Sequence, residues 1–285
     1  MKTPTKSTFA LAVEKKGKKI LFQVVALGIG LILVFPILYA FFISLMPADQ
    51  ILSNPPSILP KTIIWTNYIV AVTKTLLFRY MWNSLVLAGI SSIVRVLTAS
   101  LAAYSFTFFR FPGKNVLFMA CLGTMMIPAD IVLVANYSTV SKLGLINTYL
   151  GVMVVFFVSA VNIFVMRQHF LGFSKSLKEA AYIDGCGNFR FYAQILMPTS
   201  VPVITTVFIS AFIGTWNTYL WPLLVTNSNE MRTVQVGITM LNFPDGTVYG
   251  PIMAASILVI IPTIIVFVSF QRKIVEGMMS GSVKE

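Results

Sequence analysis

The residues with the clearest chemistry lie in one polar stretch, residues 172–198, with the sequence GFSKSLKEAAYIDGCGNFRFYAQILMP. Ser176 and Glu179 have the spacing of a capping box, in which each side chain accepts a hydrogen bond from the other residue's backbone amide, so a helix should start there. Gly185 stands where a residue in the left-handed conformation would end that helix, and Asn188 can cap a second helix. The stretch therefore predicts a helix–turn–helix.

These residue types suit a surface that docks another protein. The small side chains of Ala180 and Ala181 allow another surface to approach closely, and the turn at Gly185 sets the angle between the two helices. The carboxylate of Glu179 offers a charge to a basic partner. The alternative interpretation is local, with Glu179 only closing its capping box and Gly185 only ending a helix.

Two charged residues, Arg95 and Asp130, lie inside long apolar runs and are candidate solute contacts. Arg95 is about 14 residues, or roughly 21 Å of helix, from either end of its run, which is too deep for its side chain to reach the interface. Asp130 falls at a similar depth in the next run, so we predict an ion pair between two helices. Two interpretations of Arg95 are open: structural pairing, or recognition of an anionic group on a solute.

The segment WNTYLWP brings Trp216, Asn217, Tyr219 and Trp221 together. Aromatic faces and an amide are the groups that hold sugar rings and hydroxyls, so these four residues are further candidate solute contacts. The alternative is an interfacial aromatic belt, which Trp and Tyr form in most membrane proteins. Asn217 is expected to face inward, because an amide exposed to lipid is costly.

Helices within a membrane are the elements that must position these residues. Of the 285 residues, 57% are hydrophobic and 11% charged, and the mean hydropathy is +0.85, whereas soluble domains have about 25% charged residues. Long unbroken apolar runs favour α-helices over the short alternating strands of an outer-membrane barrel. Six runs approach or exceed the roughly 20 residues that span a bilayer: Ile20–Met46, Met81–Phe109, Val116–Val134, Leu150–Met166, Val201–Val225 and Tyr249–Phe270.

With six spans both ends of the chain lie on one side, and positive charge indicates which side. Fifteen of the 21 Lys and Arg residues fall on the side that holds both termini and five on the other, so both termini are predicted to be cytoplasmic. The predicted organisation is a cytoplasmic tail over residues 1–19, a transmembrane domain over 20–270 and a cytoplasmic tail over 271–285. Most of the positive charge behind the net +12 then lies at the cytoplasmic face of the membrane, where it meets the lipid of the inner leaflet. No motif supports nucleic-acid binding.

The polar stretch resembles a known motif. After Glu179-Ala180-Ala181 come three residues, Gly185, nine residues, Ile195, one residue, and Met197-Pro198. This pattern is similar to the EAA loop of binding-protein-dependent ABC importers, EAA-x3-G-x9-I-x-L-P, with Met197 replacing the usual Leu at little change of shape. FRFPGK at Phe109–Lys114, the WNTYLWP segment and the C-terminal tail extend the resemblance over the whole chain, toward the second permease subunit of maltose-type carbohydrate importers.

The resemblance implies a multi-pass permease subunit of a bacterial inner or plasma membrane that imports a sugar-like solute and is not an enzyme. The expected partners are a homologous second permease, two cytoplasmic ATPase subunits, an extracytoplasmic solute-binding protein and membrane lipid. Glu179, Ala180, Ala181 and Gly185 would dock the ATPase. Because no Walker A loop occurs in the chain, ATP and Mg²⁺ would be bound by the partner ATPases, and this chain would hold no cofactor or metal.

An ion-coupled secondary transporter is the alternative function. It would need carboxylates inside the membrane, for which Asp130 is the strong candidate, and it gives the EAA pattern no role. A membrane scaffold protein, the third class, would leave the patterned loop unexplained.

Overall fold

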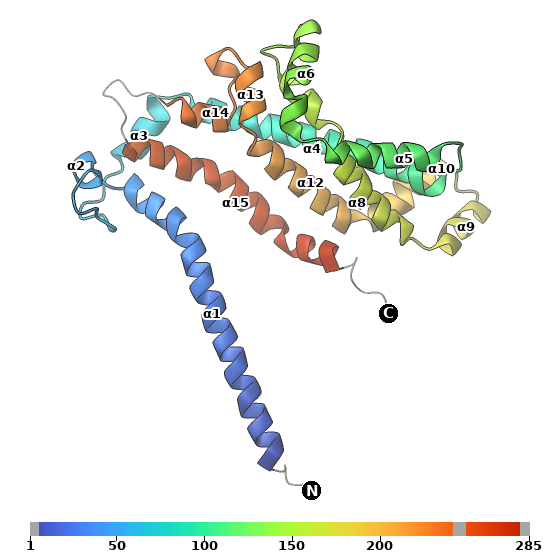
Figure 1. Cartoon of the computed structure of the whole chain (residues 1–285), viewed down its shortest axis with the longest axis horizontal. Coiled ribbons are helices and arrows are strands. Elements are labelled where there is room, and N and C mark those ends of the chain that lie inside the picture. Colours follow the sequence, from blue (N-terminus) through green and yellow to red (C-terminus); the bar gives the residue numbers. More distant parts are fainter. Residues whose placement is uncertain (1–5, 242–248, 280–285) are drawn as a thin grey trace. The chain divides into compact units, whose positions relative to one another are not determined.

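The computed structural model describes residues 6–241 and 249–279, and in these ranges the chain is helical with no strand, which confirms the all-α prediction. The chain divides into two compact units. The first holds the described residues up to Ala71 and the start of α15 (Tyr249–Met279), as far as Ile257. The second holds the described residues from Val72 to Leu241 and the rest of α15. Figure 1 labels most of the helices of both units.

The first unit is built on α1 (Lys6–Ser44), whose part from Leu21 onward is long and apolar enough to span a membrane. Two short helices follow it, α2 (Ala48–Ile51) and α3 (Thr66–Thr73), the second ending just past the boundary between the units. The segment between α2 and α3 contains Pro55, Pro56 and Pro60 and has no helix, because proline lacks the backbone N–H that a helix needs.

Asn67 of α3 holds the end of α1 in place. It is buried, and its Nδ2 donates to the carbonyl oxygens of Ser44 and Met46, both at 2.9 Å. The start of α15 lies against the same side chain, because a Cβ added at Gly250 would be 2.5 Å from that nitrogen. The last backbone carbonyl of α1, that of Ser44, and the carbonyl of Met46 just beyond the helix are therefore satisfied by a side chain.

The second unit begins with its longest helix, α4 (Leu77–Phe108). The helices that follow are α5 (Lys114–Gly123), α6 (Ala129–Lys142), α7 (Tyr149–Met153), α8 (Ala160–Leu171), α9 (Lys175–Ile183), α10 (Asn188–Phe191), α11 (Met197–Thr199), α12 (Val201–Trp216), α13 (Leu220–Val225) and α14 (Val234–Thr239). Between them lie the 3-10 turns η1 (Thr124–Met126), η2 (Val154–Phe156) and η4 (Asn229–Met231) and the π-helical segment η3 (Tyr192–Leu196).

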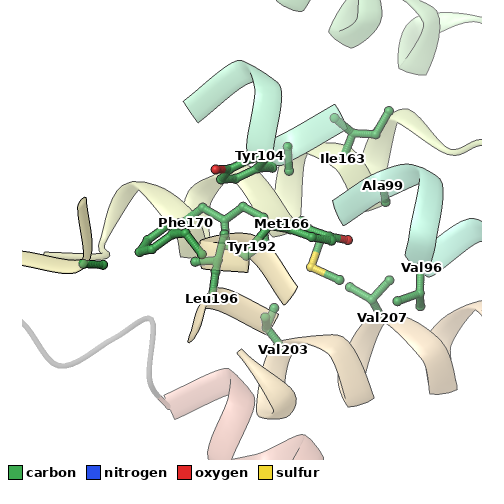
Figure 2. Packing of buried hydrophobic residues seen from close by; sticks show 13 residues of the cluster. Val96, Ala99, Tyr104, Ile163, Met166, Phe170, Tyr192, Leu196, Val203 and Val207 are labelled. Atoms are coloured by element: carbon green, nitrogen blue, oxygen red, sulfur yellow. The ribbon is translucent and has the colours of Figure 1, made fainter. Parts of the chain in front are cut away.

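α4 forms the centre of the second unit, where it lies beside α8 and α12 (Figure 1). Small side chains on α4, each no more than 1% exposed, let the neighbouring helices approach closely; they are Ala88, Ser91, Ser92, Ala99, Ser100 and Ala103. Figure 2 shows the larger side chains that fill the core, with Met166 and Phe170 of α8 close to Tyr192 and Leu196 of η3.

The N-terminal end of α4 is tied to the segment around η4 by Asn83, which is fully buried. Its Nδ2 donates to the carbonyl oxygens of Glu230 at 2.7 Å and Arg232 at 2.9 Å. Its Oδ1 accepts a hydrogen bond from the Tyr149 hydroxyl at 2.6 Å. One amide thus joins three parts of the second unit, and all its donors and its acceptor oxygen have partners.

Three of the six predicted spans are unbroken helices, and three are not. The long apolar segments Leu21–Ser44, Leu77–Phe108 and Tyr249–Gln271 match the first, second and sixth predictions. The other candidate spans are bent pairs of helices, which bring the total to six only when each pair counts as one span. The prediction of continuous helices over 116–134, 150–166 and 201–225 is therefore wrong.

Two of the three breaks have a local signal in the sequence. Between η1 and α6 the chain bends by 102° at Pro128, which has no backbone N–H to continue the helix. Between η2 and α8 it bends by 47°, where Ser159 caps the new helix by accepting a hydrogen bond from Asn162 N at 3.4 Å. The third bend, 78°, follows Thr199 at the entry to α12, and α12 ends at Trp216 rather than running to Val225.

Candidate functional site

The EAA residues lie on α9, whose start differs from the prediction. The helix begins at Lys175, with Ser174 in the N-cap position and no side chain capping it. The Ser176 hydroxyl instead forms a hydrogen bond with the Ser174 hydroxyl at 2.6 Å. The predicted capping box between Ser176 and Glu179 is therefore wrong, because the earlier start places Ser176 inside the first turn.

The turn after α9 has the geometry that the sequence predicted. Gly185 has a φ of +75°, in the left-handed region that favours glycine. Its N–H donates to Tyr182 O at 3.0 Å, and the Cys186 N–H donates to Ala181 O at 2.9 Å, which together form a Schellman motif. α10 then begins at Asn188. We call α9, this turn and α10, residues 175–191, the EAA hairpin.

Asn188 does not cap α10 with its side chain as predicted. Gly187 occupies the N-cap position, and the Asn188 Oδ1 accepts a hydrogen bond from the Tyr182 hydroxyl. The side chain therefore bridges back to α9 and closes the hairpin on itself. Beyond α10 the helix continues through the π-helical segment η3 to α11.

The EAA hairpin has one packed face and one open face. Ala181 is 6% exposed and belongs to the hydrophobic core that α4, α8 and α12 share. Glu179 and Ala180 are exposed. Large apolar side chains are open beside them, with Ile183 86% and Phe189 78% exposed. This open face combines large apolar side chains with the carboxylate of Glu179, as expected of a surface that another protein covers.

A cleft of about 460 Å³ lies between α9 and the C-terminal end of α4; its lining is Thr107, Phe108, Phe109, Arg110, Lys114, Lys178, Glu179 and Tyr182. The FRFPGK segment supplies much of this lining. The Lys114 Nζ donates to Phe109 O at 2.9 Å and Thr107 O at 3.3 Å. Because the last carbonyls of a helix lack partners within it, this lysine completes the end of α4.

The predicted ion pair between Arg95 and Asp130 is absent from the structure. The Arg95 Nε donates to Phe156 O at 2.5 Å, and its guanidinium lies 5.7 Å from the centroid of the Phe156 ring. Asp130 is exposed in the first turn of α6. The prediction failed because it assumed a straight third span, whereas the bend at Pro128 turns α6 away from the direction of α5.

The WNTYLWP segment is a helix break with two buried indoles. Trp216 is 2% exposed and stacks on Phe212, and Trp221 is 4% exposed and donates from Nε1 to Val152 O at 3.1 Å. Protein therefore occupies the faces of both rings. Asn217 and Tyr219 are exposed between α12 and α13, and solute contact by any of the four residues stays a prediction.

Gln235 is a polar neighbour of this break that sequence reasoning missed. Its Nε2 donates to the Asn217 Oδ1 at 3.2 Å, from α14 to the end of α12. The signal that could have found it is the amide itself, since a second side-chain amide is the natural partner for a polar group among apolar helices. The two residues are 18 positions apart, so no local pattern links them.

A comparison with protein families shows to which family the chain belongs. The family described as "Binding-protein-dependent transport system inner membrane component" matches residues 95–280, which include the EAA hairpin and the helix break. The chain belongs to this family. It is a multi-pass membrane permease of the ABC-importer class.

Relatives of this permease are similar over nearly their whole length. The sn-glycerol-3-phosphate transport system permease protein UgpE of Brucella abortus is 37% identical over 265 residues, covering 90% of this chain and 94% of the relative. The arabinooligosaccharides transport system permease protein AraQ of Halalkalibacterium halodurans is 31% identical over 277 residues, covering 95% and 99%. Both are named as permeases of transport systems and not as enzymes.

The fold of the permease also matches a solved structure. A chain from a bacterial ABC transporter involved in the import of the acidic polysaccharide alginate superposes with a TM-score of 0.77, covering 95% of this chain and 99% of that one. The sequence identity is 22%, so this likeness supports the fold alone.

Proposed function

We propose that this permease is the membrane-spanning subunit of an ABC importer for a sugar-like solute, and that its EAA hairpin docks on a cytoplasmic ATPase. The observation that carries the proposal is the open face of the hairpin, where Ile183 and Phe189 expose most of their apolar surface next to Glu179. Exposed apolar surface of this kind is favourable only when a partner covers it.

The remaining parts of the assembly follow from the family. A homologous second permease, two ATPase subunits and an extracytoplasmic solute-binding protein complete the importer. The ATPases bind ATP and Mg²⁺, and this chain holds no cofactor. The excess of Lys and Arg on one side supports an orientation with both termini, residues 1–19 and 271–285, in the cytoplasm, on the same side of the membrane as the EAA hairpin. Residues 1–5 and 280–285 lie outside the described residues.

The relatives support a polyhydroxylated solute, because one is named for sn-glycerol-3-phosphate and another for arabinooligosaccharides. Asn217, Tyr219 and Gln235 offer hydroxyl-binding groups at the helix break. Arg95 is assigned a structural role, since its Nε already binds Phe156 O. An ion-coupled transporter has less support, because Asp130 is exposed rather than buried among the spans.

The test compares two neighbouring glycines with opposite φ. Gly185→Val places a β-branched residue at φ +75°, which costs about 1–3 kcal/mol and distorts the hairpin. Gly187→Val is the control, because Gly187 has a φ of −69° and open space around it. We expect both variants to insert normally, and only Gly185→Val to lose ATPase co-purification and solute uptake.

Two outcomes would contradict the proposal. Wild-type ATPase association and solute-stimulated ATP hydrolysis in Gly185→Val would show that the hairpin is not the docking element. Uptake by the wild-type importer that resists vanadate and stops with an uncoupler would favour an ion-coupled transporter instead.

A further inference from the structure

We propose that Lys178 and Tyr104 are positioning residues that join the EAA hairpin to the C-terminal end of α4, so that movement of the docked hairpin also moves α4. The chain itself joins the hairpin to α8 and, through η3 and α11, to α12. Its described polar contacts with the end of α4 are made by the side chains of Lys178 and Tyr104, beside the ring contact of Phe191 with Phe108. This inference rests on the proposed function, because it assumes that an ATPase moves the hairpin. It adds α4 to α8 and α12 as a helix that the hairpin moves, and it names the side-chain contacts that join α4 to the hairpin.

Lys178 is the cation that α9 contributes to the end of α4. Its Nζ lies 3.4 Å from the carbonyl oxygen of Phe108, the last residue of α4, and 4.8 Å from the centroid of that residue's ring. The carbonyls at a helix C-terminus are unpaired and carry the negative end of the helix dipole, so a cation there is favourable. The ring adds a cation–π contact, and Tyr182 of α9 supplies a second one at 5.1 Å.

Other cations already cover the neighbouring carbonyls, so the contact of Lys178 with α4 is distinct. Lys114 of α5 binds the carbonyls of Thr107 and Phe109, and the Nε of Arg167 from α8 lies 3.4 Å from Phe106 O. Among the described contacts, Lys178 is the cation that reaches this helix end from the hairpin.

Tyr104 makes the second connection, one turn earlier on α4. It is 6% exposed, and its hydroxyl donates to Asn188 O, the first residue of α10, at 3.0 Å. The side chain of Asn188 accepts from the Tyr182 hydroxyl, so the contact continues into α9. Figure 2 shows Tyr104 beside Tyr192, and their ring centroids are 5.3 Å apart.

The two connections together constrain both arms of the hairpin. Lys178 holds α9 and Tyr104 holds α10, and both act on the last turns of one helix. Neither side chain belongs to the open apolar face around Ile183 and Phe189. Removing these contacts should therefore leave ATPase docking intact while it weakens the transfer of motion to α4.

The experiment uses the complete importer with its ATPases, reconstituted in liposomes, and measures solute transported per ATP hydrolysed. The variants are Lys178→Met, which keeps the length of the side chain without its charge, Tyr104→Phe, which removes one hydroxyl, and the double change. We expect ATPase association and ATP hydrolysis within about twofold of wild type. The solute transported per ATP should fall about fivefold or more in the double variant. When Lys178→Arg is used in place of Lys178→Met, most of the transport ratio should be restored.

Tyr149→Phe is the matched control, because it removes a tyrosine hydroxyl bond to Asn83 at the opposite end of α4. It should leave the transport ratio unchanged.

If Lys178→Met accumulates poorly, the isosteric Tyr104→Phe variant carries the test alone. An unchanged ratio in Tyr104→Phe and the double variant would overturn the inference. Loss of ATPase association in them would also overturn it, by placing these residues in docking. The Gly185→Val variant tests the proposed function separately, through its ATPase association and solute uptake.

Discussion

The Nε of Arg95 lies 2.5 Å from the carbonyl oxygen of Phe156, at the break between η2 and α8. The next carbonyl, that of Phe157, accepts from the Thr98 hydroxyl at 2.6 Å. Two residues one turn apart on α4 thus satisfy consecutive backbone carbonyls that the interrupted helix leaves open. An irregular backbone inside a membrane protein needs such partners, because lipid offers none.

Arg95→Met should lower the stability of the permease by about 1–3 kcal/mol, because it leaves the Phe156 carbonyl without its charged donor. Asp130→Ala should have almost no effect, since that carboxylate is exposed. The measurement is thermal unfolding in detergent. The effects should add in the double variant, and recovery of stability there would show that the two residues are partners after all.

The WNTYLWP residues should separate into two classes. Trp221→Phe removes the donor to Val152 O and should lower the melting temperature with little change in the KM for uptake. Asn217→Ala and Tyr219→Ala should leave the melting temperature near wild type and raise the KM. A raised KM with unchanged melting in Trp221→Phe would return that indole to the solute site.

Gly237→Ala should destabilise α14, because an added Cβ would lie 2.1 Å from Tyr80 Cδ2. Gly214→Ala is the control: a Cβ there meets nothing within 4 Å, and replacing a helical glycine by alanine is worth up to about 1 kcal/mol. Folded yield and thermal unfolding are the measurements. Tyr80→Leu in the Gly237→Ala background should recover part of the loss; no recovery would mean that Tyr80 is not the obstacle.

The orientation can be tested by cysteine labelling in intact cells, after replacement of the two free cysteines, Cys121 and Cys186, by alanine. Asn227 and Ser176 are both exposed, and each can carry a new cysteine. An impermeant thiol reagent should label Asn227→Cys and spare Ser176→Cys until the cells are broken. The reverse pattern would invert the proposed orientation.

The EAA hairpin was predictable because its turn is specified locally. Gly185 provides the positive φ and its neighbours provide the Schellman hydrogen bonds, all within a few residues. The helix starts were less accurate by one or two residues, because Ser174 and Ser176 are both able to cap and Gly187 competes with Asn188.

The helix breaks and long-range contacts were not predictable in the same way. Hydropathy measures how apolar a run is and not its direction, so the bend at Pro128 was hidden inside an apolar stretch. The partner of Arg95 is a backbone carbonyl 61 residues away, and every residue has one. A sequence shows side chains that could pair, and therefore it suggested Asp130 instead.

The bonds from Asn83 to the carbonyls of Glu230 and Arg232 have a thermodynamic consequence for the importer. They fasten one end of α4 to the segment around η4, and the other end, about 38 Å of helix beyond Asn83, meets the EAA hairpin. If α4 carries free energy between these ends, the exchange must be reciprocal. Whatever factor ATPase engagement applies to solute affinity at the proposed contacts Asn217, Tyr219 and Gln235, bound solute applies to ATPase affinity. A loaded importer would then bind its ATPases more tightly than an empty one wherever that factor exceeds one.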